Sequence, residues 1–409
     1  MHQIADFLKK IAPYLKNMSS EPVVLTECIG RIISANVTSR FSVPNKNVSN
    51  VNGYAIKSAD ITMLPTKLRV IGKSHNQNPF QGMIKDGQAV EISAGVPIPE
   101  GADAIVPLDE VSIDPKNVII KEFCPKGQNI IEKGIDIENG ETLIQAGSLV
   151  SFRDIAKAAA VKLSWLPVVR QPRIGVIVAP EENQQDSQSL YLNHAKLQTL
   201  LSFIKLLGGI PIDLGIAIDM TAPIEDVLTY KNEVKFAVQD MDMIIICGGT
   251  AMPQESLIWN SLGQFGAKIE SFSVKYTNDE ALLMGALKNI PLIGMPSSFV
   301  SMLMSSILFL GPALLKMMGK TDENFGFTKR LALLSRNLDV IDKKSDFLYG
   351  YTKEKENGEM IVTPSSGQDF LMLSALAKSD CIIYVDHSRP LTQGTTVEVI
   401  ECAWSRFRT

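Results

Sequence analysis

The clearest pattern along the chain is a series of short apolar runs between residues 173 and 320. Continuous apolar runs at Ile174–Ala179, Ile210–Ile216 and Met243–Cys247 predict buried strands. Two further strands are predicted at 268–274 and 290–294. Amphipathic stretches separate these runs, and strands that alternate with helices form a parallel sheet covered on both faces. The segment therefore predicts a doubly wound, three-layer α/β domain.

The stretches between the strands contain recognisable helix ends. Asn193 is predicted to cap a helix that ends at Gly208-Gly209, and residues 186–189 before it are typical of a loop. The stretch 299–318 is almost wholly apolar, but Gly311-Pro312 interrupts it. It is therefore expected to be a buried core helix and not a membrane span. Further helices are predicted over 223–238 and 256–262.

The flanking segments have other patterns. An N-terminal helix is expected, and a second helix is expected to begin at Ser151, with Asp154 three residues later as its capping partner, and to end near Lys162. Short β-rich runs between Gly/Pro turns fill 45–136, and similar runs fill 326–409, so each predicts a small β-rich domain. The apolar face of the N-terminal helix consists of Ile4, Phe7, Leu8, Ile11 and Leu15.

These patterns divide the chain into four domains, as expected for its 409 residues. An N-terminal linker domain is discontinuous, with residues 1–44 and 137–170, and a β-rich domain, 45–136, is inserted in it. The α/β domain covers 171–325, and a C-terminal β-rich domain covers 326–409. The predicted fold class is therefore α/β plus β-rich domains.

Composition narrows the possible functions. The formal net charge is −4, which gives no electrostatic reason to expect nucleic acid or an anionic membrane surface as a partner. The five cysteines are odd in number, and none is in a CxxC spacing. This argues against a zinc site or a disulfide framework and favours the reducing cytoplasm.

Polar residues and glycines follow the ends of the predicted strands, which is where parallel sheets bind ligands. Glu182 follows the first strand and Asp219 the second. Gly248-Gly249-Thr250 follows the third, and Ser297-Ser298 precedes the last helix, whose free N–H groups suit a phosphate. Each feature also has a plain interpretation: a helix cap, a turn or a solvated loop acid. The set favours a small anionic ligand but does not name it, and there is no Walker A or GxGxxG sequence.

A second group of acids lies in the segment Gly134–Glu141. Carboxylates in a short loop suit Mg²⁺, which binds through one or two acids and substrate phosphates. An exposed acidic turn explains the same residues, and on these residues alone it is the simpler interpretation.

Four segments resemble motifs of one family. Ser93–Val106 resembles TGxPxPxGADAVV, Asn52–Ala55 resembles MDGYA, Gly134–Gly147 resembles GxDxxxGexLLxxG, and Cys247–Thr250 resembles SGGxS. Their order and spacing also fit, and the similarity covers essentially the whole chain. The sequence is therefore identified as resembling the molybdopterin molybdenumtransferase family, as a divergent member.

The resemblance implies an elongated four-domain homodimer with a central molybdopterin-binding α/β domain. It also implies an activity: insertion of molybdate into adenylylated molybdopterin, with Mg²⁺ and release of AMP, as a step in molybdenum cofactor biosynthesis. Molybdopterin adenylyltransferase is the upstream partner that this activity implies. By motif position, the catalytic residues are Glu182, Asp219 and Asp136, and Glu182 and Asp219 hold the metal. The substrate-binding positions are Gly248, Gly249, Thr250, Ser297, Ser298, Asn52 and Lys275.

The departures from the family pattern fall on the same positions. The aspartate of MDGYA is Asn52, and the aspartate that ends the SxGxxD turn is Ser256. The KPGKP loop reads Thr277–Ala281, which leaves Lys275 as the nearby cation, and LPGNP reads Met295–Phe299. Loss of two lysines beside an anionic ligand favours a second hypothesis, a catalytically impaired carrier or scaffold that binds molybdopterin. A nucleotide-pyrophosphate hydrolase is a third hypothesis, although no motif requires it.

Overall fold

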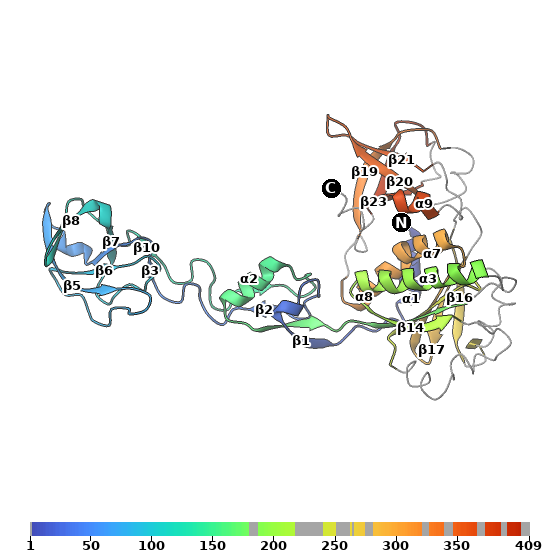
Figure 1. The fold of residues 1–409 in the computed structure, drawn as a ribbon, viewed down its shortest axis with the longest axis horizontal. Coiled ribbons are helices and arrows are strands. Elements are labelled where there is room, and N and C mark those ends of the chain that lie inside the picture. The colour runs from blue at the N-terminus through green and yellow to red at the C-terminus, as the bar shows by residue number, and fades with distance from the viewer. Residues whose placement is uncertain are drawn as a thin grey trace. The chain divides into compact units, whose positions relative to one another are not determined.

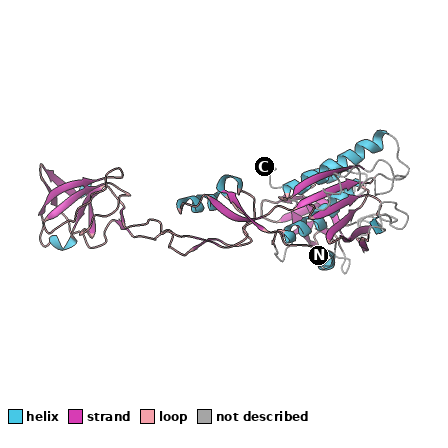
Figure 2. Ribbon diagram, turned by 90° about the horizontal axis from the view of Figure 1, so that it is seen from below, coloured by secondary structure: helices cyan, strands magenta, loops and turns pink. Residues whose placement is uncertain are grey.

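The computed structural model describes residues 2–179, 187–216, 240–250, 262–263, 266–274, 281–320, 327–338, 347–365, 373–385 and 391–401. Its contacts divide the chain into two compact units, which are considered separately (Figures 1 and 2). The first unit combines Met1–Glu21 with Val169–Thr409, and the second is Pro22–Val168.

The second unit contains a six-stranded sheet with the order β7-β4-β6-β5-β9-β8. Neighbouring strands are antiparallel except for β5 and β6, which are parallel. Buried side chains cover both faces of the sheet and form two apolar clusters. The β-rich pattern predicted for this part of the chain is thus confirmed. The elements are β4 (Gly53–Ile56), η2 (Ser58–Asp60), β5 (Thr66–Ser74), β6 (Gln88–Ile92), β7 (Ala104–Pro107), η3 (Leu108–Glu110), β8 (Val111–Asp114) and β9 (Asn117–Ile120).

Two chain segments flank this sheet and pair with one another. β2 (Val37–Thr38) pairs with β11 (Thr142–Ile144), and β3 (Val48–Ser49) pairs with β10 (Ile130–Ile131). The predicted helix at Ser151 is confirmed as α2 (Phe152–Ala160), which begins after a capping box of Ser151 and Asp154. The remaining elements are β1 (Ser20–Val24), η1 (Leu25–Glu27) and β12 (Trp165–Val169), and β1 and β12 form a two-stranded sheet.

The first unit is built on a six-stranded sheet with the order β14-β13-β15-β18-β17-β16. The strands β14, β13, β15 and β18 run parallel. The three predicted apolar runs and the strands at 268–274 and 290–294 are confirmed. The strands are β13 (Arg173–Val178), β14 (Ile210–Ile216), β15 (Met243–Cys247), β16 (Lys268–Ser273), β17 (Ala281–Leu287) and β18 (Ile290–Met295).

The prediction of a parallel sheet is confirmed for β14, β13, β15 and β18, but the sheet is antiparallel at the edge that contains β17. β17, which was not predicted from the sequence, pairs antiparallel with both β18 and β16. The connection from β17 to β18 is a two-residue turn in which Lys288 and Asn289 both have positive φ, +48° and +70°. Such hairpin turns usually carry Asn-Gly or Asp-Gly. Because that signal is missing, the hairpin could not be recognised from the sequence.

The helix after β13 differs from its prediction at the N-terminal end. α3 covers Ser187–Leu206, so residues 187–189 are helical and do not form the predicted loop. Asn193 lies inside the helix and is buried, so it is not the N-cap. Asn193 is instead a buried polar residue that contacts Lys196, a position that could not be predicted from capping preferences. The predicted stop at Gly208-Gly209 is confirmed by the positive φ of Gly208.

The apolar stretch near residue 300 forms α7 (Phe299–Ser305), the π-helical segment η4 (Ser306–Leu310) and α8 (Gly311–Met317). By length and composition Phe299–Met317 is apolar enough to cross a membrane, but 78% of its most apolar stretch of 18 residues is buried inside the protein. This agrees with the prediction of a core helix.

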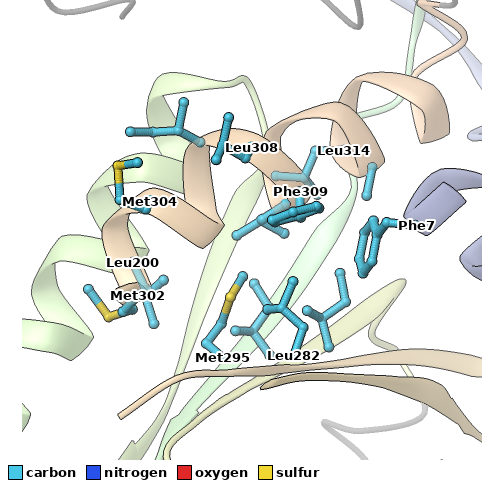
Figure 3. Close-up of a cluster of buried hydrophobic side chains, with 14 of the residues drawn as sticks. Phe7, Leu200, Leu282, Met295, Met302, Met304, Leu308, Phe309 and Leu314 are labelled. Atoms are coloured by element: carbon cyan, nitrogen blue, oxygen red, sulfur yellow. The ribbon is translucent and has the colours of Figure 1, made fainter. Parts of the chain in front are cut away.

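The same core includes the N-terminal helix α1 (His2–Ile11). The rings of Phe7, Phe272 and Phe309 meet edge to face, with centroids 5.1 to 5.9 Å apart. Figure 3 shows Phe7 and Phe309 of this group. The predicted apolar face is confirmed for Ile4, Phe7, Leu8 and Ile11, whereas Leu15 follows the end of α1 and is partly buried. The helix packs in the α/β unit, whereas the predicted domain boundaries grouped 1–44 together. The four-domain boundaries remain predictions.

The C-terminal part of the first unit is a closed barrel with the order β19-β21-β20-β22-β23. It confirms the strand-like runs predicted after residue 326. Phe347 and Tyr349 of this barrel belong to the same buried cluster as the helices of the α/β sheet. The elements are β19 (Thr328–Leu334), β20 (Phe347–Glu354), β21 (Met360–Pro364), α9 (Leu373–Lys378), β22 (Cys381–Tyr384) and β23 (Thr396–Glu401).

Candidate functional site

Three parallel strands of the first unit end at the same level. Val178 of β13 is opposite Cys247 of β15, and Cys247 is opposite Met295 of β18. The backbone pairing continues one residue further, because Ala179 N–H donates to the Cys247 carbonyl at 2.8 Å and Gly248 N–H donates to the Met295 carbonyl at 3.0 Å. The residues that follow β13, β15 and β18 therefore begin from one edge of the sheet, where ligands bind in folds of this kind.

The turn after β15 requires glycine. Gly248 and Gly249 have φ values of +110° and +67°, a region that other residues rarely adopt. A Cβ atom on Gly248 would lie 2.3 Å from the Ala179 carbonyl oxygen, so no side chain fits there. Thr250, the third predicted substrate-binding residue of this turn, is buried. All three residues thus lie where β15 ends, and the two glycines leave the backbone of the turn without side chains.

The two serines after β18 have different surroundings. Ser298 is the N-cap of α7: its Oγ accepts a hydrogen bond from Ser301 N–H at 3.2 Å and donates to Ser301 Oγ at 2.7 Å. The plain interpretation of a helix cap therefore applies to Ser298. Ser297 is half-buried beside it at the same edge. Its substrate-binding role stays a prediction.

Two of the family-like motifs meet in the sheet of the second unit. β4 lies between β6 and β7, with Tyr54 paired to Glu91 on one side and Val106 on the other. Asn52 precedes this strand and is exposed. Its Oδ1 accepts a hydrogen bond from Ala94 N–H at 2.8 Å. Asn52 thus fixes the turn after β6 through an oxygen acceptor that an aspartate would also supply.

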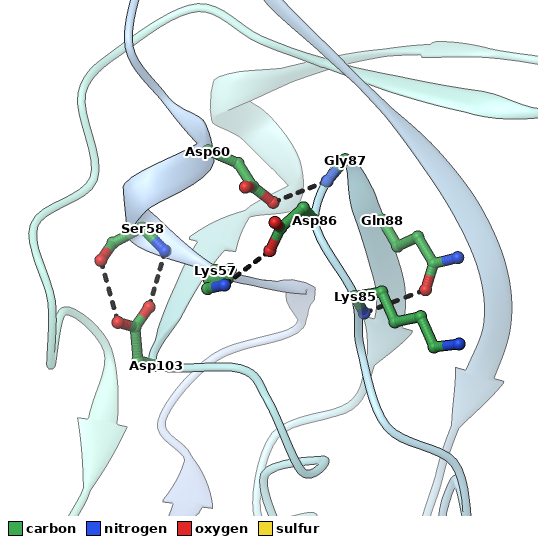
Figure 4. Close-up of polar contacts among 8 residues, drawn as sticks. All are labelled: Lys57, Ser58, Asp60, Lys85, Asp86, Gly87, Gln88 and Asp103. Atoms are coloured by element: carbon green, nitrogen blue, oxygen red, sulfur yellow. Dashed lines mark hydrogen bonds and ion pairs between the residues drawn. The ribbon is translucent and has the colours of Figure 1, made fainter.

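The aspartate of the GADA segment has a structural role. Asp103 accepts hydrogen bonds from Ser58 N–H at 2.6 Å and from Ser58 Oγ at 3.0 Å, which secures η2 (Figure 4). Nearby, Asp60 accepts from Gly87 N–H at 2.9 Å, and the Lys57 ammonium pairs with Asp86 at 2.5 Å. The hydrogen bond from Lys57 lowers the pKa of Asp86. These acids therefore hold loops of the sheet.

The acidic loop after β10 is fixed mainly through its backbone. Asp136 N–H donates to the Val43 carbonyl at 3.2 Å, and Gly134 N–H donates to the Pro44 carbonyl at 3.0 Å. Glu141 accepts from Glu138 N–H at 3.0 Å, so one acid of the loop closes its own turn. The Asp136 side chain is exposed. The loop has the form of an exposed acidic turn, and the catalytic role of Asp136 stays a prediction.

Three predicted site residues, Glu182, Asp219 and Lys275, lie outside the residues that the structure describes. In the described ranges, no group of three or more His, Cys, Asp or Glu side chains is placed so that it could hold a metal ion. The predicted Mg²⁺ site, which consists of Glu182 and Asp219, is therefore neither assembled nor contradicted by the described side chains.

Comparisons with known proteins agree with the motifs. The MoeA N-terminal region (domain I and II) matches residues 2–161. Molybdopterin molybdenumtransferase of Haemophilus influenzae is 26% identical over 93% of both chains. The Bacillus subtilis protein of that name is 22% identical over 97% of this chain and 93% of its own.

A solved structure defines the fold class. The crystal structure of molybdopterin biosynthesis moea protein from Pyrococcus horikosii superposes with a TM-score of 0.78 at 22% identity, and covers 97% of this chain and 98% of its own. The chain thus has the multidomain α/β and β-rich fold of these proteins. The sequence matches show that the chain resembles the molybdopterin molybdenumtransferase family over almost its entire length.

Proposed function

We propose that this protein is a molybdopterin molybdenumtransferase that inserts molybdate into adenylylated molybdopterin and releases AMP. The observation that supports this most strongly is the turn at Gly248-Gly249, which has no side chains and directly follows β15. β13 and β18 end at the same level of the sheet as β15. A backbone surface at this edge suits a ligand that carries phosphates. Relatives that bear this name match almost the entire length of the chain.

In this proposal Glu182 and Asp219 hold Mg²⁺, and Asp136 contacts the substrate. Carboxylate oxygens are the ligands that Mg²⁺ prefers. When bound, the ion would offset the negative charge of the two anionic reactants. The chain's own groups position these reactants: Gly248, Gly249 and Thr250 at the turn, Ser297 and Ser298 at the start of α7, and also Asn52 and Lys275.

We further propose a homodimer in the cytoplasm. The second unit exposes several large apolar side chains, including Ile29 (62% exposed), Phe152 (71%) and Trp165 (55%). Apolar surface of this kind is typical of protein contacts, and a second copy of the chain is the simplest partner. The four cysteines that the structure describes are free and buried, which suits a reducing compartment. Molybdopterin adenylyltransferase would supply the adenylylated substrate.

Cofactor assembly in a reconstituted system tests the activity. The full-length protein is mixed with molybdate, Mg²⁺ and adenylylated molybdopterin, and AMP and the molybdenum cofactor are measured separately. We expect AMP release that depends on molybdate. The formation of AMP without cofactor would instead support a hydrolase.

A carrier or scaffold is the second candidate. Asn52 favours it, because its amide keeps the hydrogen bond to Ala94 without the negative charge of the aspartate in the family motif. The missing lysines at Thr277–Ala281 favour it as well. In the same experiment, a carrier binds the pterin and releases no AMP.

A further inference from the structure

Helix α3 buries two polar side chains in the first half of its length. Asn193 is 4% exposed and Lys196 is 8% exposed. They lie on the same face as Leu197 and Leu200, which pack into the core of the α/β unit, because residues three, four and seven apart share one face of a helix. A lysine on this face is unusual, because lysine is almost never fully buried unless it is paired.

The position of Lys196 along the sheet follows from helix geometry. The last turn of α3 lies beside the beginnings of the strands. Gly209 N–H donates to the Ile204 carbonyl of α3, and Ile210 N–H, at the start of β14, donates to the carbonyl of Pro172, which directly precedes β13. From Ile204 back to Lys196 the helix rises about 12 Å, and β13 rises about 16 Å from Arg173 to Val178. Lys196 therefore lies about three-quarters of the way to the carboxyl ends of the strands.

The Lys196 side chain spans the remaining distance to the carboxyl ends of the strands. Side chains of a helix lean toward its N-terminus, which for α3 is the end opposite the strand beginnings and so on the side of the strands' carboxyl ends. Lys196 follows this rule, because its Nζ donates to Asn193 Oδ1, one turn earlier, at 3.4 Å. The ammonium group thus lies near the level at which the strands end. Leu200, one turn further along, shares a buried cluster with Met302 of α7 (Figure 3).

Within the described part of the chain, few groups compensate the charge of the Lys196 ammonium. An ammonium group has three donors, and among the described residues Asn193 is the hydrogen-bond partner that Lys196 has, at a long distance. In that part of the chain no carboxylate forms an ion pair with it. A buried cation with one neutral partner is costly for folding, and an anion that binds beside it removes the cost.

We propose that Lys196 binds an oxyanion of the substrate, a phosphate group or molybdate, at the carboxyl edge of the α/β sheet, with Asn193 as its positioning residue. This lysine would supply positive charge that the Thr277–Ala281 segment lacks. The inference rests on the proposed function for the identity of the ligand. The presence of an anion site at Lys196 does not depend on the proposed function.

Binding measurements on the full-length protein test the proposal. AMP and molybdate are titrated separately by calorimetry into the wild type, Lys196→Met, Lys196→Gln and Lys196→Arg. Lys205→Met, at an exposed position of the same helix, is the control. We expect the Met and Gln variants to lose about tenfold or more in affinity for one of the probes, as for a lost charged hydrogen bond. The affinities of Lys196→Arg and Lys205→Met should stay within about threefold of the wild-type affinity, since both variants keep a cation at position 196.

The affected probe identifies the source of the oxyanion: AMP for a phosphate group, molybdate for the metal oxyanion. Thermal unfolding without ligand is measured in parallel, and Lys196→Met should be at least as stable as the wild type. If both neutral variants bind AMP and molybdate like the wild type, or if the wild type binds neither probe, the inference is wrong. If binding depends on Lys196 but no cofactor is assembled, the inference holds and the proposed transferase activity fails.

Discussion

Asn52 shows how a residue of the candidate site can also hold the fold. At this position the family motif has an aspartate, and the amide here makes the hydrogen bond to Ala94 that a carboxylate oxygen would make. The substitution therefore removes a charge and keeps a contact. The same distinction applies to Asp103, which matches its motif and binds Ser58. A motif match alone does not separate residues that bind a ligand from residues that bind a neighbouring loop.

Gly53 gives a residue-scale prediction. A Cβ atom there would lie 2.1 Å from the Val106 carbonyl oxygen, where β4 pairs with the edge strand β7 in the sheet of the second unit. Gly53→Ala should destabilise this unit by about 3 kcal/mol, since backbone must move to accept the methyl group. Gly95→Ala faces open space at a φ of +78° and should cost only about 1 kcal/mol. Urea unfolding followed by circular dichroism compares the two variants, and equal losses would contradict the close contact.

At the scale of elements, the sequence predicted best where local chemistry decides the structure. The capping box of α2 and the apolar runs of β13, β14 and β15 are fixed by neighbouring residues and by burial, and each was predicted within a few residues. β17 was missed because its turn uses Lys288 and Asn289 at positive φ. α3 was predicted to begin too late, because a polar residue before an apolar face looks like a cap, whereas Asn193 is buried within the helix.

The capping box of α2 has a predictable pH dependence. Burial raises the pKa of Asp154, but hydrogen bonds from Ser151 Oγ and N–H, at 2.7 and 2.8 Å, outweigh it, and the pKa is lowered. A lowered pKa means that the stabilisation is present above the unfolded value of about 3.9 and is lost as the pH falls through the folded pKa. Asp154→Asn should therefore weaken hydrogen-exchange protection of α2 by about 1 kcal/mol at pH 7.

The difference between this variant and the wild type should narrow as the pH falls below about 4, where the unfolded-state carboxyl begins to take up its proton. Asp109→Asn, in η3 of the same unit, is the control. A difference that stays constant from pH 7 to pH 3 would show that the Asp154 charge has no part in the cap.

The docking of α1 is the second prediction at this scale. Phe7 is fully buried between Phe272 and Phe309, so Phe7→Ala leaves a cavity in the core of the first unit. The expected loss in the free energy of unfolding is about 3 kcal/mol. Lys9→Ala, on the exposed side of α1, should change it by less than about 0.5 kcal/mol. If both variants unfold at the same denaturant concentration, α1 does not contribute to this core.

At the scale of the whole molecule, the predicted site residues are divided between the two units. Asn52 and Asp136 belong to Pro22–Val168, whereas the turn at Gly248-Gly249 and the serines before α7 belong to the other unit. The resemblance to the molybdopterin molybdenumtransferase family could be recognised from the sequence because the motifs retain their order and spacing along the chain. The roles of single residues were less predictable, since a role depends on which backbone groups surround each side chain after folding.

Molybdate-dependent release of AMP by the full-length protein, measured in a single turnover with adenylylated molybdopterin and Mg²⁺, tests the central claim most directly. Glu182→Gln is compared with the wild type, and Glu270→Gln, an exposed acid of β16, is the control. The proposed transferase predicts rapid release by the wild type and the control, and release slowed by a factor of about 100 or more in Glu182→Gln. A wild-type protein that binds the pterin but releases no AMP when molybdate is added would contradict it.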